Sequence, residues 1–233
     1  MVFWRFSMAK RSSICLNAHE SILKRIHLQD KTNCRPIEET IKVLAKLVKE
    51  GKFDHIGLSE VSAATIRRAA KVHPIATVEI EYSLWATEAK TNGVLDTAKE
   101  LGIAIIAYSP LGRGVLTGKW KKPEDVPSLL RERFPRFSDE NFSANMKFVH
   151  FVEEMAKRKG CTPGQLAIQW VMAQGDHIIP IPGASAVERV IENLGAANVT
   201  LSQAELHEMN KFAEETEPKG GRYGGPQEAL LWA

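Results

Sequence analysis

An aromatic residue followed by a glycine-rich loop with one arginine is the part of this chain whose residue types best suit chemistry. Residues 108–114 read Tyr-Ser-Pro-Leu-Gly-Arg-Gly and come directly after the apolar run 103–107. At the C-terminal end of a parallel strand, where α/β proteins bind ligands, the ring of Tyr108 can stack on a flat heterocycle. The glycines let backbone N–H groups approach an anion, and Arg113 can pair with phosphate. The loop indicates a nucleotide cofactor, and a tight turn beside a buried tyrosine is the open alternative.

Two acidic residues, Glu79 and Glu81, occupy alternate positions of another expected strand, so both side chains share one face. Such a pair can hold a metal or exchange protons, but we favour a polar layer at the rim of a barrel, with Tyr82 facing the helices on the other side. Trp170 is expected to pack between helices. The charged stretch 119–132 is expected to be a solvated loop, with a flap near the substrate as the alternative.

The elements that must position these residues alternate between helix and strand from Pro36 onward. Strands are expected at 55–59, 77–82, 103–108 and 178–181, and the early steps of about 25 residues between strands match one βα unit. This repetition predicts either a doubly wound parallel sheet or a (β/α)8 barrel. Helices are expected over 36–50, 62–72, 88–101, 144–159, 163–173, 186–196 and 202–215.

The composition is that of an ordinary globular protein, with 44% hydrophobic and 25% charged residues in 233. A net charge of +3 is too close to balance to indicate nucleic acid or an anionic membrane as partner. No apolar stretch is long enough for a membrane span. The three cysteines form no C-x-x-C pair and the seven histidines show no ligand spacing, so we expect no metal and a cytoplasmic, reducing location. The first 19 residues lack acids and only faintly match a mitochondrial transit peptide.

Five strings occur in one order and with one spacing: Gly-Leu-Ser-Glu at 57–60, Val-Glu-Ile-Glu-Tyr-Ser-Leu at 78–84, the stretch 101–118, Ile-Pro-Gly at 181–183 and Arg-Val-Ile-Glu-Asn at 189–193. Together they resemble the aldo-keto reductase family, most closely its fungal pyridoxal reductase-like branch, over Pro36 to Ala213. The resemblance implies a (β/α)8 TIM-type barrel. It also implies an oxidoreductase that binds NADP(H) across the strand ends and reduces a small carbonyl substrate by hydride transfer.

The resemblance also implies which residues contact the cofactor. Tyr108 resembles the ring that stacks on the nicotinamide, and Arg189 is the natural partner of a 2′-phosphate. Glu60 and Glu79 stand where the family often has amides, and a charged carboxylate cannot donate a hydrogen bond. No further cation follows Pro182, so NAD stays open beside NADP. The implied cofactor-binding residues are Ser59, Glu60, Glu79, Tyr108, Ser109, Leu111, Gly112, Arg113, Pro182, Gly183, Arg189, Glu192 and Asn193.

The resemblance begins near the fourth strand of the family's barrel, whereas the family's catalytic Asp, Tyr and Lys belong to its first three βα units. No tyrosine precedes Tyr82. His27, at the end of a weak strand pattern over 22–28, is the one candidate remnant of the family's active-site histidine, and a chance histidine is the favoured alternative. We therefore expect an N-terminally shortened, incomplete barrel holding strands 4 or 5 to 8. Residues 1–35 would be unrelated or disordered, 36–216 the partial barrel and 217–233 a surface tail.

Two functions follow from this comparison. The first is an NADP-dependent aldo-keto reductase acting on aldehydes or ketones, such as pyridoxal-like compounds, and impaired in this shortened chain. The second is a catalytically inactive derivative that binds a nucleotide or a protein. Because an incomplete barrel leaves strand edges open, we also expect self-association through those edges.

Overall fold

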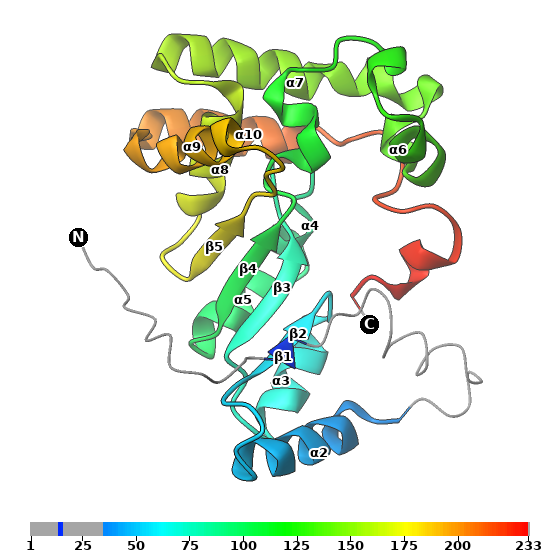
Figure 1. Cartoon of the computed structure of the whole chain (residues 1–233), viewed down its shortest axis with the longest axis vertical. Helices are drawn as coiled ribbons and strands as arrows, with labels where there is room; N and C mark the ends of the chain where they lie inside the picture. Colours follow the sequence, from blue (N-terminus) through cyan, green and yellow to red (C-terminus); the bar gives the residue numbers. More distant parts are fainter. Residues whose placement is uncertain (1–13, 16–34, 233) are drawn as a thin grey trace.

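A single parallel sheet with helices around it forms the centre of the molecule. The structure is a computed structural model, and it describes residues 14–15 and 35–232 (Figure 1). The strands pair in chain order, as in a segment of a barrel, without the reversal of order that marks a doubly wound sheet. The fold is therefore that of an incomplete (β/α)8 barrel. Its strands are β1 (Ile14–Cys15), β2 (Ile56–Ser59), β3 (Thr77–Glu81), β4 (Ala104–Tyr108) and β5 (Ile178–Ile181).

The four strands expected from the sequence are confirmed to within one or two residues. The two-residue strand β1, which pairs with β2, was not expected. The weaker strand pattern over 22–28, with His27 at its end, lies outside the described residues. In the ladder, Tyr108 lies opposite Glu81 on one side and Ile181 on the other, so the C-terminal residues of three strands form one row.

The helices follow the expected alternation and begin at polar caps. Ser62, Thr162 and Ser202 each accept a hydrogen bond from the backbone N–H three residues later, which satisfies one free donor of the first turn. The single helix expected over 88–101 is divided at Gly93, whose φ is 82°. The helices are α2 (Ile37–Lys49), α3 (Ala63–Ala70), α4 (Glu88–Thr91), α5 (Val94–Glu100), α6 (Ser128–Arg133), α7 (Asp139–Lys159), α8 (Pro163–Met172), α9 (Val187–Leu194) and α10 (Gln203–Glu215).

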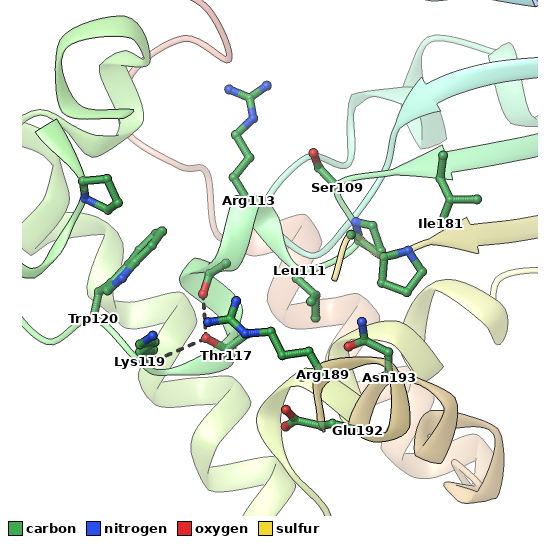
Figure 2. Close-up of a pocket in the computed structure, with 16 residues that line it drawn as sticks. Ser109, Leu111, Arg113, Thr117, Lys119, Trp120, Ile181, Arg189, Glu192 and Asn193 are labelled. Atoms are coloured by element: carbon green, nitrogen blue, oxygen red, sulfur yellow. Dashed lines mark hydrogen bonds between the residues drawn. The ribbon is translucent and has the colours of Figure 1, made fainter. Parts of the chain in front are cut away.

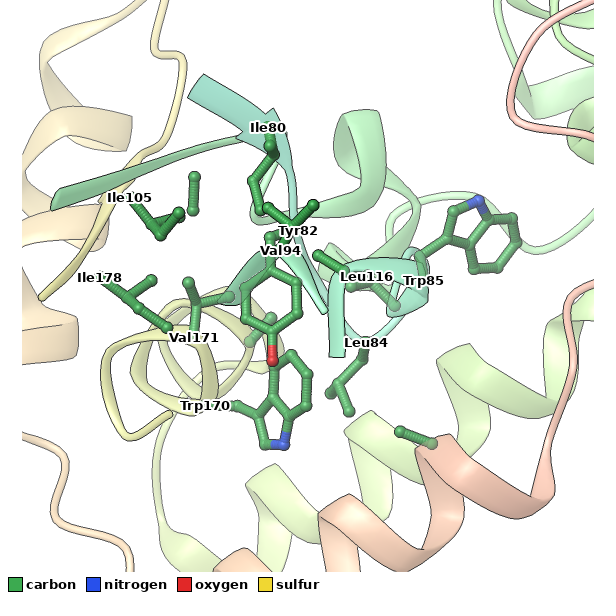
Figure 3. Packing of buried hydrophobic residues seen from close by; sticks show 14 of the residues in the cluster. Ile80, Tyr82, Leu84, Trp85, Val94, Ile105, Leu116, Trp170, Val171 and Ile178 are labelled. Carbon is green, nitrogen blue, oxygen red and sulfur yellow. The ribbon is translucent and has the colours of Figure 1, made fainter. Parts of the chain in front are cut away.

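The core lies between the strands and α8 (Figure 3). Ile80, Ile105 and Ile178 come from adjacent strands and are at most 5% exposed. Tyr82 faces this core and packs against Trp170 with 5.4 Å between ring centroids. Both predictions, Tyr82 on the helix side and Trp170 between helices, are confirmed. The acidic residues Glu79 and Glu81 therefore lie on the opposite face of β3.

The C-terminal segment is not the surface tail that the sequence suggested. Arg222 and Tyr223 are only 2% and 7% exposed. The segment runs beside α6 toward the end of β2 (Figure 1), where the backbone N–H of Trp232 donates to the carbonyl of Glu60 at 2.9 Å. The prediction was wrong because glycine and proline content indicates irregular backbone but says nothing about burial. Buried carboxylates at the strand ends give the Arg222 side chain partners.

An apolar surface lies at the β5 end of the sheet. Within the described residues β5 pairs only with β4, and α9 contains no buried residue. Val187, Ile191 and Leu194 on α9 are 69%, 65% and 69% exposed. Over the same part of the chain, no helix combines the length and the apolar character needed to cross a membrane.

Candidate functional site

The loop after β4 has a backbone that only a few residue types adopt readily. Gly112 and Gly114 have φ of 57° and 107°, and the non-glycine residues Ser109 and Arg113 also lie at positive φ, 51° and 59°. Hydrogen bonds from Gly112 N to Ser109 O (2.9 Å) and from Gly114 N to Leu111 O (3.0 Å) hold these turns. Left-handed backbone at non-glycine residues costs on the order of 1 kcal/mol each and collects at ligand sites. The expected loop is thus a rigid, strained turn at a strand end.

A cavity of about 860 Å³ lies beside this loop (Figure 2). One wall is the loop itself, and the other consists of the end of β5 with α9. The two walls are separated by roughly seventy residues of sequence and meet because β4 and β5 are adjacent. The predicted site residues that line the cavity are Ser109, Leu111, Arg113, Pro182, Gly183, Arg189, Glu192 and Asn193.

Two cations face this cavity from opposite walls. Arg189 reaches in from α9, and Lys119 follows the strained loop on the other side (Figure 2). Trp120 and Pro127 also line the cavity, so the stretch 119–132 is not simply the solvated loop that the sequence suggested. It closes the cavity because Trp120 is fixed by an edge-on contact with Phe137, 6.1 Å between centroids. An anion in the cavity would meet these two positive charges beside the carboxylate of Glu192.

A second group of residues, called here the rim cluster, joins the strand ends to the C-terminal segment. It consists of Glu60, Glu81, Tyr108, Arg222 and Tyr223. The Tyr108 hydroxyl donates to Glu60 Oε1 at 2.8 Å and lies 3.0 Å from the Tyr223 hydroxyl. Arg222 donates to both oxygens of Glu60, at 2.7 and 3.2 Å, and from Nε to Glu81 Oε2 at 3.2 Å. Both carboxylates are almost fully buried, and pairing with the guanidinium offsets the free-energy cost of burying their charge.

Arg113 links the rim cluster to the cavity. Its Nη2 donates to Glu81 Oε2 at 2.7 Å, and its guanidinium lies 3.8 Å from the centroid of the Phe134 ring. In Figure 2 this guanidinium points away from Arg189. The sequence assigned Arg113 to a phosphate, but its charge is already paired with Glu81. Arg189 and Lys119 are the cations whose side chains face the cavity.

Burial and charge in the rim cluster shift its proton equilibria. Burial raises the pKa of Tyr108, and the neighbouring Glu60 and Glu81 carboxylates raise it further. Burial likewise raises the pKa of Tyr223, with Glu81 adding to it. Burial disfavours the charged form of Arg222, but Glu81 and Glu60 outweigh that effect and raise its pKa. Both tyrosines therefore keep their protons and the guanidinium keeps its charge.

Glu81, one of the two acidic residues of β3, belongs to an ion-pair network at the strand ends. The described residues contain no group of His, Cys, Asp and Glu side chains arranged to hold a metal ion. Glu81 is paired with Arg113 and Arg222 at 2.7 and 3.2 Å. The interpretation of a polar layer at the barrel rim is the one that fits this pairing.

Ser59 at the end of β2 has a buried hydroxyl for which the described residues supply no hydrogen-bond partner. The residue is 2% exposed. An unsatisfied buried hydroxyl costs about 1–3 kcal/mol, and its place at the end of a strand of the sheet puts Ser59 where a ligand could supply the partner. With Glu60, Glu79, Tyr108 and Gly112, Ser59 belongs to the predicted residues that do not line the cavity itself.

Sequence reasoning missed Arg222, Thr117, Lys119 and Trp120. The one available signal for Arg222 was its setting, an Arg-Tyr pair between two Gly-Gly pairs at 220–225. In this setting two large polar side chains stand out in a backbone that otherwise consists of glycine. Lys119 and Trp120 carry no comparable signal, because only the fold brings them opposite α9.

Comparison with known proteins agrees with this geometry. The family model described as "Aldo/keto reductase family" matches residues 20–214. The aldo-keto reductase str7 of Strobilurus tenacellus is 44% identical over 190 residues, 80% of this chain and 56% of that protein. The aldo-keto reductase yakc [NADP(+)] of Schizosaccharomyces pombe is 44% identical over 191 residues, 81% of this chain and 56% of that protein. The chain thus spans about half the length of these curated relatives.

Solved structures show the same fold. The glycerol dehydrogenase of Gluconobacter oxydans matches with a TM-score of 0.70 and 27% identity, covering 79% of this chain and 56% of that one. An aldo/keto reductase from Klebsiella pneumoniae, solved with NADP and acetate, matches with a TM-score of 0.58 and 24% identity over 81% of this chain and 58% of that one. The strained loop, the cavity between β4 and β5 and the match over most of the sequence lead to one conclusion: the chain belongs to the aldo/keto reductase family.

Proposed function

We propose that the cavity binds the pyrophosphate and adenosine portion of NADP(H), with the nicotinamide directed toward Tyr108. The observation that carries this proposal is the placement of Arg189 and Lys119 on opposite walls of one cavity beside a strained glycine loop. The relative from Schizosaccharomyces pombe carries NADP(+) in its name. A guanidinium and an ammonium supply the charged donors that a diphosphate and a 2′-phosphate require.

The residues present fit such a cofactor. Gly183 faces open space, since a Cβ there would meet nothing within 4 Å, and backbone can approach a ligand closely at that point. The unpartnered Ser59 hydroxyl is available to the carboxamide of the nicotinamide. The buried hydroxyl of Tyr108 is held by Glu60, which fixes the direction of the ring and so the place where a heterocycle would stack. When bound, NADPH supplies a hydride to the carbonyl carbon of a substrate.

The cation pair supports a preference for NADP over NAD. The sequence offered only Arg189 for the 2′-phosphate, whereas the structure adds Lys119 from the opposite wall. A bidentate guanidinium and a compact ammonium together favour a dianionic phosphate over a ribose hydroxyl. NAD would keep the pyrophosphate contacts and lose this part of the binding.

For catalysis we propose that the described residues provide cofactor binding but not an activated proton donor. The three tyrosines of this sequence are Tyr82, Tyr108 and Tyr223. Tyr82 lies in the core, and burial raises the pKa of all three. A tyrosine that donates a proton to a carbonyl needs its pKa lowered toward the working pH. This observation favours the second candidate function, a catalytically inactive derivative that binds a nucleotide or a protein.

The reaction class that we propose for the family site is reduction of a small aldehyde or ketone, with pyridoxal-like carbonyls as the first compounds to test. His27 stays a weak candidate for a catalytic role. The cysteine content supports a reducing, cytoplasmic location, and the near-balanced charge supports the absence of a nucleic-acid partner.

The test is a titration of the purified chain with NADPH and with NADH, followed by tryptophan fluorescence because Trp120 lines the cavity. We expect saturable binding that is tighter for NADPH. A second assay follows NADPH oxidation with pyridoxal and simple aldehydes, and we expect little or no turnover. Failure to bind either cofactor would overturn the proposed site, and robust turnover would overturn the proposed lack of an activated donor.

A further inference from the structure

We propose that Arg222 is a positioning residue that sets the two side chains Tyr108 and Arg113 through the carboxylates of Glu60 and Glu81. This inference rests on the proposed cofactor function, because it treats Tyr108 and the loop that Arg113 anchors as parts of the cofactor site. It gives the C-terminal segment a role in the site, although no residue of that segment lines the cavity.

The guanidinium of Arg222 uses all three of its nitrogens within the rim cluster. Nη1 and Nη2 donate to the two oxygens of Glu60, and Nε donates to Glu81 Oε2. The side chains of Arg222, Glu60 and Glu81 are 1%, 1% and 3% exposed. A two-pronged contact of this kind fixes orientation as well as distance. Arg222 therefore determines where both carboxylates point.

Glu60 passes this orientation on to Tyr108. Its Oε1 accepts from the Tyr108 hydroxyl at 2.8 Å and from the backbone N–H of Glu81 at 2.7 Å. Arg222 Nη2 also donates directly to the Tyr108 hydroxyl at 3.2 Å. The hydroxyl is at the far end of the ring from the backbone, so holding it fixes the direction of the long axis of the ring and therefore the position of the ring. A stacked heterocycle would need the ring to be held in one position.

Glu81 passes the orientation on to Arg113. Its Oε2 is shared between Arg222 Nε and Arg113 Nη2, and Arg113 Nη1 donates to the backbone carbonyl of Arg222 at 3.4 Å. Arg113 has a φ of 59° in the middle of the strained loop. Its side chain is therefore an anchor for the loop whose other residues line the cavity.

The charges of the cluster balance only when Arg222 is present. Two buried carboxylates meet two guanidiniums, those of Arg113 and Arg222. The other charged or titratable groups that face the cluster are Tyr108, Tyr223 and Glu228, whose carboxylate accepts from the backbone N–H groups of residues 222 and 223. Without Arg222, one buried carboxylate would be left without a cation, and burial would favour its protonated form. A positioning role of Arg222 therefore predicts that the NADPH affinity of a variant without it depends on pH, whereas a loss of packing alone would not have this effect.

The C-terminal segment has anchors that do not depend on the Arg222 side chain. Lys219 N donates to Asn145 Oδ1 at 2.7 Å, and Arg136 Nε donates to the carbonyl of Gly220 at 3.1 Å. Trp232 N donates to the carbonyl of Glu60. A substitution at Arg222 should therefore leave the segment in place while releasing the carboxylates.

The experiment compares Arg222→Met with Arg222→Lys and with the control Lys219→Met, which removes a cation from an exposed position of the same segment. NADPH affinity is measured by fluorescence from pH 5.5 to 8.5. We expect flat profiles for the unmodified chain and the control. Arg222→Met should lose about ten- to a hundredfold in affinity at high pH and recover part of it at low pH, where a carboxylate is protonated. The affinity of Arg222→Lys should lie between those of the unmodified chain and Arg222→Met, because lysine restores the charge but cannot make the two-pronged contact.

Two further measurements separate this inference from the proposed function. Adding Glu60→Gln to Arg222→Met removes the unpaired charge and should flatten the pH profile. Hydrogen exchange of peptides covering 108–118 needs no cofactor and should speed up in Arg222→Met but not in the control. If the unmodified chain does not bind NADPH, the proposed function fails, and faster exchange alone would still establish positioning of the loop. An unchanged pH profile and unchanged exchange in Arg222→Met, or in Arg222→Lys if the Met variant does not fold, would overturn the role of Arg222.

Discussion

The hydroxyl of Tyr108 donates to the carboxylate of Glu60 at 2.8 Å, which ties together the ends of two strands that are not neighbours in the sheet. β3 lies between them, and its last residue, Glu81, joins the same network through Arg222. The ring that we propose to stack on the nicotinamide is therefore held from its far end. Removing the whole ring and removing only the hydroxyl should therefore weaken NADPH binding by different amounts.

Tyr108→Ala is expected to weaken NADPH binding by about 1–3 kcal/mol, the size of one aromatic stacking contact, or roughly five- to 150-fold. Tyr108→Phe keeps the ring but removes the hydrogen bond to Glu60, so its loss should be smaller. Fluorescence titration measures both. Tyr82→Phe is the matched control, because the Tyr82 hydroxyl is buried in the core, has no hydrogen-bond partner in the part of the chain that the structure describes, and should leave affinity unchanged when removed. Equal affinities of the Ala variant and the unmodified chain would contradict a stacking role.

Ser59→Ala should have different effects on the free energy of unfolding and on NADPH affinity. Because the Ser59 hydroxyl is buried and unpartnered, its removal is expected to leave the free energy of unfolding unchanged or to raise it by about 1 kcal/mol. NADPH affinity should fall by about three- to tenfold if this hydroxyl contacts the carboxamide. Denaturant unfolding and cofactor titration give the two numbers.

Ser83→Ala is the control for that pair of measurements. The Ser83 hydroxyl accepts from Trp85 N at 3.1 Å, so its loss should cost about 1 kcal/mol of stability without affecting affinity. A Ser59→Ala variant that loses stability and keeps its affinity would show that Ser59 is structural.

Arg189→Gln and Lys119→Gln should each weaken NADPH binding by about tenfold or more and leave NADH binding nearly unchanged. The reason is that both cations face the cavity, where the 2′-phosphate of NADPH is the group that NADH lacks. The measurement is the ratio of the two dissociation constants for each variant. Lys211→Gln, an exposed lysine of α10, provides a control for charge alone. Equal losses for both cofactors would place these cations at the pyrophosphate instead.

We also predict that the chain self-associates through the apolar surface of α9 and the edge of β5. Ile191→Lys, on the exposed side of α9, should shift the protein toward a monomer in size-exclusion chromatography with light scattering. Val43→Lys adds the same charge at a 58% exposed position on α2 and should change nothing. A monomer already in the unmodified chain would refute this prediction.

Acid should destabilise the start of α10 through Glu205. Hydrogen bonds from Lys159 and from Ser202 lower the pKa of Glu205 from 4.5 to about 2. Because the folded value lies below the unfolded one, this contribution is fully present above pH 4.5 and is lost as the pH falls toward 2. Glu205→Gln should therefore flatten the pH dependence of the unfolding midpoint in that range. Glu208→Gln, at the exposed ion pair with Arg158, should not.

The sequence predicted most of the fold because its signals are local. Apolar runs mark β2 to β5, and Ser62, Thr162 and Ser202 mark helix starts that the structure contains. The break at Gly93 and the early start of α7 at Asp139 were missed, since a helical pattern continues across both.

The candidate site was predictable only in part. The loop after β4 and helix α9 form opposite walls of one cavity because β4 and β5 are neighbours, which the order of strands implies. Arg222 could not be placed, because nothing in a glycine-rich stretch shows that its guanidinium meets two carboxylates on other strands. The place of Lys119 beside the cavity could not be predicted either, because nothing in the sequence distinguishes it from the other surface lysines around it.

The row formed by Glu81, Tyr108 and Ile181 at the ends of three adjacent strands limits how this family member can change over evolution. Side chains alternate between the faces of a sheet, so one residue inserted within β4 would turn Tyr108 from the rim toward the helices and separate it from Glu60. Insertions between α6 and α7, or in the loop before α9, would leave the row intact. Variation in length should therefore accumulate in the connections, while the strands that carry the site keep a fixed length.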